Sequence, residues 1–339
     1  MKESEYKDLR QRDEYIDSID RLLERLGVEA EQNRKDALAK AGGKENLRRQ
    51  YFAMLGYPLT TYVCDPNINV KTELPIAYDG MITTRYQLEV LPGFWLYGML
   101  YEHKDSDRAK KNALIIAQHG GLGSPEIVGS LVNDSANYNH MVRRVIGEDR
   151  TVFAPQLLLW DRSVYEGKEY DRNAVDLRLR QFGGSITGLE VYCVMRCIDH
   201  FAGRDWIDGA RVGMIGLSYG GMYTLYTAAA DTRIKVALSS CWFNDRLEYK
   251  WPDWVFFNQA NLFMDAEVGS LVLPRKLYVE IGTDDTLFDY RKAEADFERL
   301  RAYAEAEGRA DSLRIKVFDG GHELDTAEDG IQFLLEGLG

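Results

Sequence analysis

Six short apolar segments alternate with helical patterns from residue 112 to the end of the chain, and this alternation constrains the fold more than any other feature. The segments are NALIIAQ (112–118), TVFAPQ (151–156), RVGMIG (211–216), KVALSS (235–240), KLYVEIG (276–282) and RIKVFDG (314–320). Helical patterns lie near 134–146, 185–203, 219–230, 290–307 and 325–337. Such alternation is typical of a mainly parallel sheet with helices on both faces. Ligands bind such sheets at the carboxyl ends of the strands.

The residues before this region follow two other patterns. Residues 84–103 alternate apolar and polar side chains about LPG, which predicts two antiparallel strands at the edge of the sheet. Before them, residues 1 to about 56 are helical in pattern. The first helix carries an apolar stripe and is expected to end at Gly27, and a second helix is expected over about 45–55. The stripe consists of Tyr15, Ile16, Ile19, Leu22, Leu23 and Leu26.

We therefore divide the chain into an N-terminal helical extension (1–75) and an α/β domain (76–339). The extension carries no catalytic residue type at a strand end. We expect its apolar stripe to pack on the core or on a second subunit, and the second alternative predicts a homo-oligomer.

Composition excludes several classes of partner. The 339 residues include 42 basic and 54 acidic side chains, giving a net charge of −12, which argues against a nucleic-acid partner. No apolar run approaches the ~20 residues of a membrane span, and the N-terminus lacks the apolar stretch of a signal peptide. The four cysteines fit a reducing compartment better than a disulfide scaffold. These features predict a cytoplasmic protein that binds no membrane.

A serine stands at the junction of an apolar strand and a helix of small residues. In GLSYGG (216–221), Gly216 and Gly220 flank Ser218 at positions −2 and +2. This spacing lets the strand and the helix approach each other while the serine occupies a strained turn. The pattern predicts that Ser218 is a nucleophile. An ordinary glycine turn that contains a serine is the alternative interpretation.

A base and an acid follow in the order that such a nucleophile requires. Among the five histidines only His322 lies beyond Ser218, on the glycine loop FDGGHELD after the last predicted strand. Between the two, KLYVEIGTDDTLFD offers Asp284 and Asp285 at the end of a strand. A carboxylate there would orient the imidazole and stabilise its protonated form. We prefer Asp285 and expect Asp284 to cap the loop or to be solvated.

The glycine loop IIAQHGGLGSPE (115–126) supplies a candidate oxyanion site. Its glycines follow an early strand, so backbone N–H groups can approach a developing negative charge. We assign the two donors to the N–H groups of Gly121 and Tyr219. His119 is expected to be a structural residue of this loop. No phosphate-binding motif and no H-E-x-x-H motif is present, and no metal or organic cofactor is expected.

The motifs HGGLG, GLSYGG, GTDD and GGHE resemble the oxyanion loop, nucleophile turn, acid turn and histidine loop of the α/β-hydrolase superfamily. The resemblance covers roughly residues 80–339. Residues 210–241 are similar to the dienelactone hydrolase-like and acetyl xylan esterase-like branch, although dienelactone hydrolases proper use a cysteine nucleophile. The turn SYGG also occurs in prolyl-oligopeptidase-like peptidases, but no propeller-sized domain precedes this core. The resemblance implies an α/β-hydrolase fold and a serine esterase.

Two insertions are expected to form the walls of a substrate site. Residues 242–273 are rich in aromatic side chains, which predicts a cap over the nucleophile. Trp242, Trp251 and Trp254 are its candidate substrate-binding residues. A core-packed insertion or a subunit contact is the alternative. A second insertion, residues 157–173, should form another wall.

Together these features predict a serine carboxylic ester hydrolase that acts on a small-molecule ester through an acyl-enzyme. Acetylated carbohydrates are one candidate class of substrate. A small-peptide or amide hydrolase with the same three residues is the first alternative. The second, from a different class of protein, is a catalytically silent interaction module with the hydrolase fold.

Overall fold

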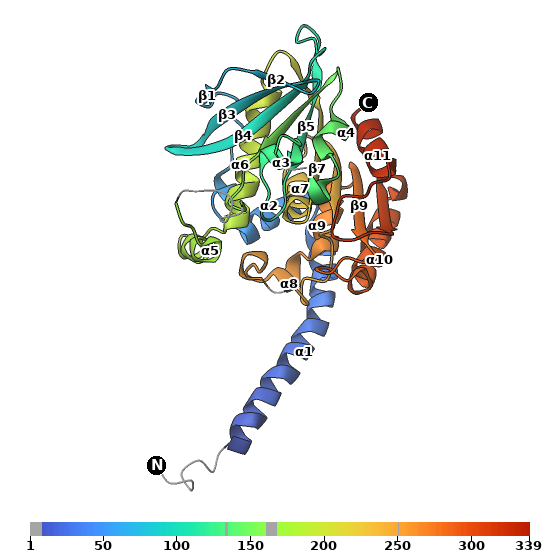
Figure 1. Cartoon of the computed structure of the whole chain (residues 1–339). Helices are drawn as coiled ribbons and strands as arrows, with labels where there is room; N and C mark the ends of the chain where they lie inside the picture. The colour runs from blue at the N-terminus through green and yellow to red at the C-terminus, as the bar shows by residue number, and fades with distance from the viewer. Residues whose placement is uncertain (1–8, 133–134, 161–167, 250) are drawn as a thin grey trace.

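The computed structural model describes residues 9–132, 135–160, 168–249 and 251–339 (Figure 1). The strands are β1 (Val70–Thr72), β2 (Ile76–Tyr78), β3 (Met81–Leu91), β4 (Phe94–His103), β5 (Asn112–Gln118), β6 (Arg150–Pro155), β7 (Ile207–Leu217), β8 (Ile234–Ser240), β9 (Lys276–Gly282) and β10 (Leu313–Phe318). The helices are α1 (Leu9–Lys40), α2 (Lys44–Leu55), α3 (Pro125–Val128), α4 (Met141–Val145), α5 (Arg172–Gln181), α6 (Ile186–Ala202), α7 (Tyr219–Ala230), α8 (Gln259–Leu262), α9 (Asp265–Val272), α10 (Tyr290–Ala306) and α11 (Asp329–Leu338). Short 3₁₀ turns include η3 (Ala136–Tyr138) and η4 (Pro252–Trp254).

One mixed sheet organises the molecule, and it confirms the predicted fold class. The strand order is β1-β3-β4-β6-β5-β7-β8-β9-β10, with β2 paired to β3. The pairs β3–β4 and β4–β6 are antiparallel, whereas every pair from β6–β5 to β9–β10 is parallel. All six predicted strands of the parallel region are present, and the predicted hairpin forms the antiparallel part.

Helices cover both faces of this sheet, as the alternating pattern predicts. Apolar side chains of α2, α6, α7, α9 and α10 form the core on one face. The smaller core on the other face contains residues of α4 and α11. Strand β5 is buried over its whole length and β7 over its last six residues, because both lie in the middle of the sheet. Among the described residues, no helix is both long and apolar enough to cross a membrane.

Helix α1 projects from the body of the molecule (Figure 1) and corrects the expected helix end. It continues through Gly27, because one glycine inside a helix costs only about 1 kcal/mol relative to alanine. Its last turns dock on α8, where the Arg34 guanidinium donates to the carbonyl of Ala260 at 2.5 Å and pairs with Glu267 at 3.3 Å. In α1 as described, the buried residues are Ala30 and Arg34.

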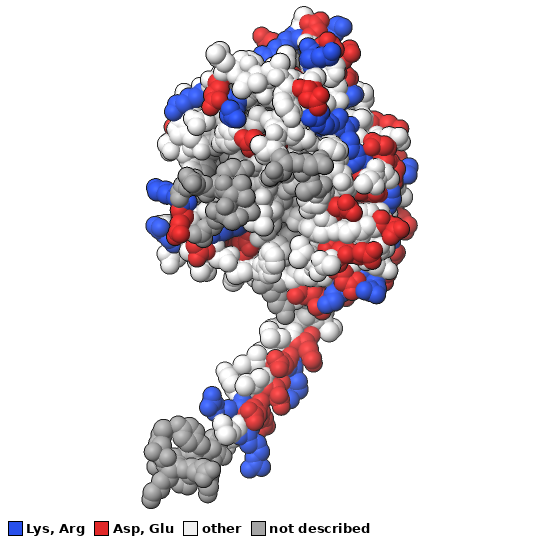
Figure 2. Space-filling view, viewed as in Figure 1, with Lys and Arg blue, Asp and Glu red and all other residues white. Residues whose placement is uncertain are grey.

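The apolar stripe of α1 does not pack on the core, which excludes one of the two expected placements. Its six members are 39–69% exposed, and Figure 2 shows a strip of uncharged residues along α1 beside acidic ones. Ile16, Leu23 and the buried Ala30 follow one another at intervals of seven residues and therefore lie on one side of the helix. The stripe thus continues the face that docks on α8. The second placement, on another subunit, stays a prediction.

We expect two copies of the chain to associate through this stripe. Apolar residues at alternating spacings of three and four (Ile16, Ile19, Leu23, Leu26) form the seam of paired helices. Six such side chains from each copy would bury roughly 1,000 Å² in total, close to the smallest specific interfaces of about 1,200 Å². The expected result is a dimer that dissociates on dilution, measured by light scattering over a range of concentrations.

Matched substitutions on opposite sides of α1 test this dimer. Leu23→Asp should convert the protein to a monomer, because it places a charge in the seam. Val28→Asp should leave the mass unchanged, because Val28 is 77% exposed and lies on the opposite side of the helix. A parent protein that is monomeric at every concentration contradicts the prediction.

Candidate active site

Ser218 occupies a strained turn between β7 and α7, in the strand–turn–helix context that its motif predicts. Its φ of 61° and ψ of −125° are unusual for a residue with a side chain. The Ser218 N–H donates to the carbonyl of Ser240 at 2.9 Å, which fixes the turn to β8. A Cβ on Gly216 would collide with the carbonyl of Gly220, and a Cβ on Gly220 would collide with the carbonyl of Gln118 at the end of β5, so both positions require glycine.

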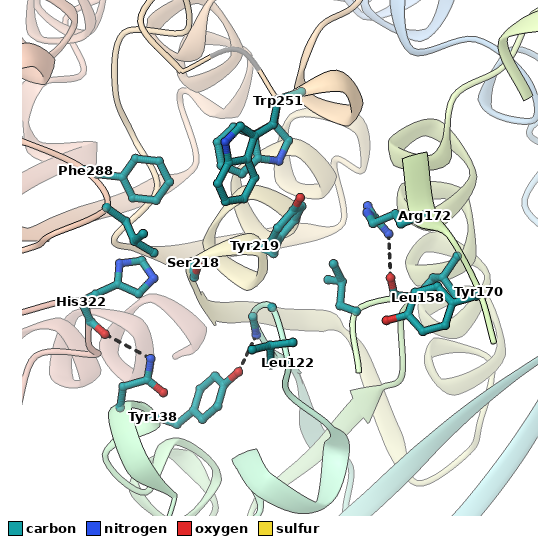
Figure 3. A pocket seen from close by; sticks show the side chains of 16 residues that line it. Leu122, Tyr138, Leu158, Tyr170, Arg172, Ser218, Tyr219, Trp251, Phe288 and His322 are labelled. Carbon is teal, nitrogen blue, oxygen red and sulfur yellow. Dashed lines mark hydrogen bonds between the residues drawn. The ribbon is translucent and has the colours of Figure 1, made fainter. Parts of the chain in front are cut away.

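His322 and Asp285 form a hydrogen-bonded pair beside this serine. The His322 Nδ1 and Asp285 Oδ2 atoms are 2.8 Å apart, and His322 and Ser218 line the same cavity. Figure 3 shows the imidazole ring beside the serine. Because Nδ1 binds the carboxylate, Nε2 is the ring nitrogen left for Ser218.

The second oxygen of Asp285 is held by the backbone. Oδ1 accepts the N–H groups of Leu287 at 2.8 Å and Phe288 at 3.0 Å. Burial acts to raise the pKa of Asp285, but the hydrogen bond and charge of His322 and the two N–H groups outweigh it and hold the pKa below its ordinary value. Asp285 is therefore a rigid, ionised partner. Asp284 is exposed, and its backbone N–H donates to the carbonyl of Gly320.

The two N–H groups assigned to the oxyanion site have no acceptor among the described residues. Both Gly121 and Tyr219 line the cavity that contains Ser218. The neighbouring N–H groups of the glycine loop are engaged: Gly120 donates to the Tyr138 hydroxyl at 2.8 Å and Leu122 to the Leu159 carbonyl at 2.6 Å. Gly121 is thus the member of this trio whose N–H is available to a ligand.

His119 holds the glycine loop in place, as expected. Its Nδ1 bonds to the carbonyl of Gly120 at 2.8 Å, and its Nε2 accepts the N–H of Leu157 at 3.1 Å. Burial lowers the pKa of His119 to about 4, so the ring is neutral at pH 7. The ring joins the glycine loop to the second insertion.

The aromatic insertion contributes two of its three candidate tryptophans to the cavity. Trp251 and Trp254 line it and stack with ring centroids 4.3 Å apart. The structure does not bring Trp242 into the lining: it is fully buried beneath Trp254, with centroids 4.6 Å apart. The second insertion adds Leu158, Leu159 and Tyr170 to the wall, whereas its residues 161–167 lie outside the described residues.

Sequence reasoning missed three side chains that position the site. Asn137 Nδ2 donates to the carbonyl of His322 at 3.1 Å, and Tyr138 holds the glycine loop. Arg172 ties the two walls together through Asp253 at 2.8 Å and the Leu158 carbonyl at 3.2 Å. These residues belong to no motif, and their partners are distant in sequence, so no local signal identifies them.

A buried glutamate lies beneath the histidine loop. Glu280 of β9 accepts the N–H of Asp325 at 3.0 Å, three residues beyond His322. Burial raises the pKa of Glu280 to about 7, against the opposing effect of this hydrogen bond. The folded protein thus retains a proton that the unfolded chain releases near its ordinary pKa of 4.5.

This raised pKa predicts a stability change near neutral pH. The contribution of Glu280 is fully present below its unfolded pKa and is lost as pH rises through about 7. Glu280→Gln is neutral at every pH. Between about pH 5 and pH 8 the free energy of unfolding of this variant should therefore fall less than that of the parent, as measured by urea denaturation. The control Glu305→Gln changes an exposed residue of α10 and should keep the parental slope. The same slope in Glu280→Gln would show that Glu280 does not titrate in this range.

Two groups of described side chains could offer atoms to a metal ion. One is Cys241, Asp285 and His322, and the other is His103, Asp105 and Glu148. In the first group, Nδ1 and Oδ2 already bind each other, and the Cys241 thiol bonds to the Glu323 carbonyl at 3.2 Å. A metal there would have to break the His–Asp pair.

Known protein sequences match part of this chain. The Prolyl oligopeptidase family matches residues 190–266, which include the Ser218 turn. A match of 28% identity over 167 residues links the chain to "Putative hydrolase YtaP" of Bacillus subtilis (strain 168). It covers 46% of this chain and 56% of that relative, so the chain spans little more than half the length of the curated relative it matches.

Solved structures resemble nearly the whole chain. A glucuronoyl esterase from Solibacter usitatus superposes with a TM-score of 0.65 at 14% identity, covering 90% of this chain and 94% of that one. Acetyl xylan esterase 1 from Thermoanaerobacterium sp. JW/SL YS485 has a TM-score of 0.56 at 14% identity, with 87% and 93% covered. The chain has the α/β-hydrolase fold.

Proposed function

We propose that this chain is a serine ester hydrolase with Ser218 as nucleophile, His322 as general base and acid, and Asp285 as the residue that orients the histidine. The observation that carries the proposal is the location of all three parts at one end of the sheet. A strained serine and a histidine line one cavity, and a buried carboxylate binds the far nitrogen of that histidine.

The proposed reaction has two stages. His322 Nε2 accepts the Ser218 proton while Oγ bonds to the ester carbonyl carbon, and the N–H groups of Gly121 and Tyr219 stabilise the oxyanion. The protonated histidine then gives its proton to the departing alcohol, leaving an acyl group on Ser218. Water, deprotonated by His322, attacks this acyl group, and His322 then gives the proton to the departing Ser218 Oγ, which releases the acid and the free serine.

Two observations favour a working catalyst over a silent module. The Gly121 and Tyr219 N–H groups lack acceptors among the described residues and belong to residues that line the cavity in front of Ser218, where the oxygen of a substrate can accept them. The backbone at Ser218 is strained, and such strain is usually retained at functional sites. The two structural neighbours are named as esterases, and this analogy of fold favours an ester over an amide substrate. A similar fold does not by itself fix the bond that is cleaved, so the choice is made by experiment.

Turnover of matched esters and anilides tests this proposal. We expect hydrolysis of nitrophenyl esters, with a rapid first release of nitrophenol equal to the enzyme concentration wherever deacylation is slow. Peptide anilides should be cleaved far more slowly or not at all. Efficient anilide cleavage with weak ester turnover would support the peptidase alternative. No turnover of any member of either series would support the silent module.

A further inference from the structure

The cavity at Ser218 has an apolar lining. Its volume is about 370 Å³, within the range of small-molecule sites. Leucine and aromatic side chains from the glycine loop, from both insertions and from the loop after β9 dominate its walls, among them Leu122, Leu158, Leu159, Leu287, Trp251 and Phe288. Figure 3 shows Leu122, Trp251 and Phe288 around the space in front of Ser218. A group that fills this space exchanges water for hydrocarbon and aromatic contacts.

The phenol groups of the lining are already hydrogen-bonded within the protein. Tyr219 donates its hydroxyl proton to Asp253 at 2.9 Å, and Tyr170 donates to the carbonyl of Trp160 at 2.7 Å. Tyr138 accepts the N–H of Gly120. A sugar ring brings several hydroxyl groups, and each one buried without a partner carries a desolvation penalty. The described lining therefore suits a sugar poorly.

The positive charge of the lining is compensated as well. The Arg172 guanidinium is 11% exposed and pairs with two carboxylates, Glu190 at 2.9 Å and Asp253 at 2.8 Å. It also donates to the Tyr223 hydroxyl at 2.7 Å. One cation between two nearly buried carboxylates leaves no positive charge for a ligand. A substrate carboxylate near Arg172 would face a cluster of net negative charge.

A flat aromatic surface remains open to a ligand. Trp251 is 49% exposed, and its indole ring stacks on Trp254 with an interplanar angle of 23°. Such a stacked pair offers a further ring an apolar face. Beside this pair, the Phe288 ring lies 5.8 Å from the Trp254 ring and 5.8 Å from the His322 ring, centroid to centroid. The walls beside the nucleophile thus match a planar, uncharged group.

We propose that this site takes an uncharged ester carrying an aromatic ring, in preference to a carbohydrate ester or a carboxylate-bearing ester. The proposal rests on the function proposed above and specifies its substrate class. The aromatic group lies against Trp251, and the ester carbonyl lies at Ser218 with its oxygen toward Gly121 and Tyr219.

Three acetyl esters with the same acyl group test the substrate class. 1-Naphthylmethyl acetate should have a kcat/KM about 10-fold or more above an acetylated methyl xyloside, because both release an alkyl alcohol and only the first buries an aromatic ring. It should also exceed a carboxylate-bearing naphthylmethyl acetate, because Glu190 and Asp253 repel the added negative charge. Similar or higher values for the acetylated xyloside would overturn the proposal. Equal values for the charged and neutral naphthyl esters would overturn its charge argument.

Two aromatic substitutions from the same insertion connect this preference to the wall. Trp251→Ala should lower kcat/KM for 1-naphthylmethyl acetate about 10-fold while leaving ethyl acetate nearly unchanged, since only the first has a ring to stack. Phe257→Ala is the control, because Phe257 is 91% exposed and does not line the cavity. Equal effects of the two variants would contradict the assignment to Trp251.

A separate experiment distinguishes failure of the proposed substrate class from failure of the proposed serine mechanism. Labelling of Ser218 by a fluorophosphonate depends on the nucleophile and not on the substrate preferred. Labelling together with a preference for the xyloside would reject the aromatic class and retain the serine hydrolase. Absence of labelling would reject both.

Discussion

Replacing Ser218 with alanine is expected to lower kcat for ester hydrolysis by 10⁴-fold or more, on the order found when a member of a nucleophile–base pair is removed. Alanine keeps the Cβ and removes only the oxygen that would bond to the carbonyl carbon. The positive φ of 61° remains accommodated by the same turn. Initial rates with a nitrophenyl ester measure the effect, and the unfolding temperature shows that the fold is retained.

Ser18→Ala provides the matched control for this substitution. Ser18 is exposed on the projecting part of α1, where its hydroxyl donates to the carbonyl of Glu14 and accepts from the Arg21 guanidinium, both within the same helix. We expect parental kcat and KM for this variant. Full activity in Ser218→Ala would contradict the nucleophile assignment directly.

Asp285→Asn should produce the second largest loss, about 10³- to 10⁴-fold in kcat. The asparagine amide can present its NH₂ group to His322 Nδ1, which favours the tautomer whose Nε2 carries a proton. That nitrogen then cannot accept the serine proton. The effect is measured as kcat of Asp285→Asn and of the parent over a range of pH.

The neighbouring Asp284→Asn variant is the control, because Asp284 is exposed and, within the described part of the chain, it bonds only through its backbone N–H. We expect its kcat within about two-fold of the parent, as for most surface substitutions. A larger loss in Asp284→Asn than in Asp285→Asn would show that Asp285 is not the residue that orients His322. The roles proposed for Ser218 and His322 would be unaffected.

The sequence predicts the parallel sheet and the His–Asp pair well, because both depend on short segments. Each strand from β5 to β10 is an apolar run with a clear boundary, and in this fold the three candidate residues must follow strand ends in a fixed order. Ser218, His322 and Asp285 can therefore be placed from local patterns. The choice between Asp284 and Asp285 needs the geometry, since both carboxylates follow the same strand.

Features that depend on long-range packing escape the same reasoning. Gly27 is a helix stop by propensity, yet α1 passes through it. Trp242 and Trp251 belong to one aromatic segment, but Trp242 packs in the core whereas Trp251 reaches the cavity, a difference of tertiary contact that composition does not encode. The pairing of Arg172 with Glu190 and Asp253 joins three separate parts of the chain. The charge of the pocket follows from that pairing.

Mass spectrometry of the protein after reaction with a fluorophosphonate tests the central claim most directly. We predict one adduct per chain, and after proteolysis it should map to the peptide that contains Ser218. The adduct should be absent in Ser218→Ala and should form much more slowly in Asp285→Asn. An adduct on a different residue, or equal labelling of the parent and Ser218→Ala, would contradict the account.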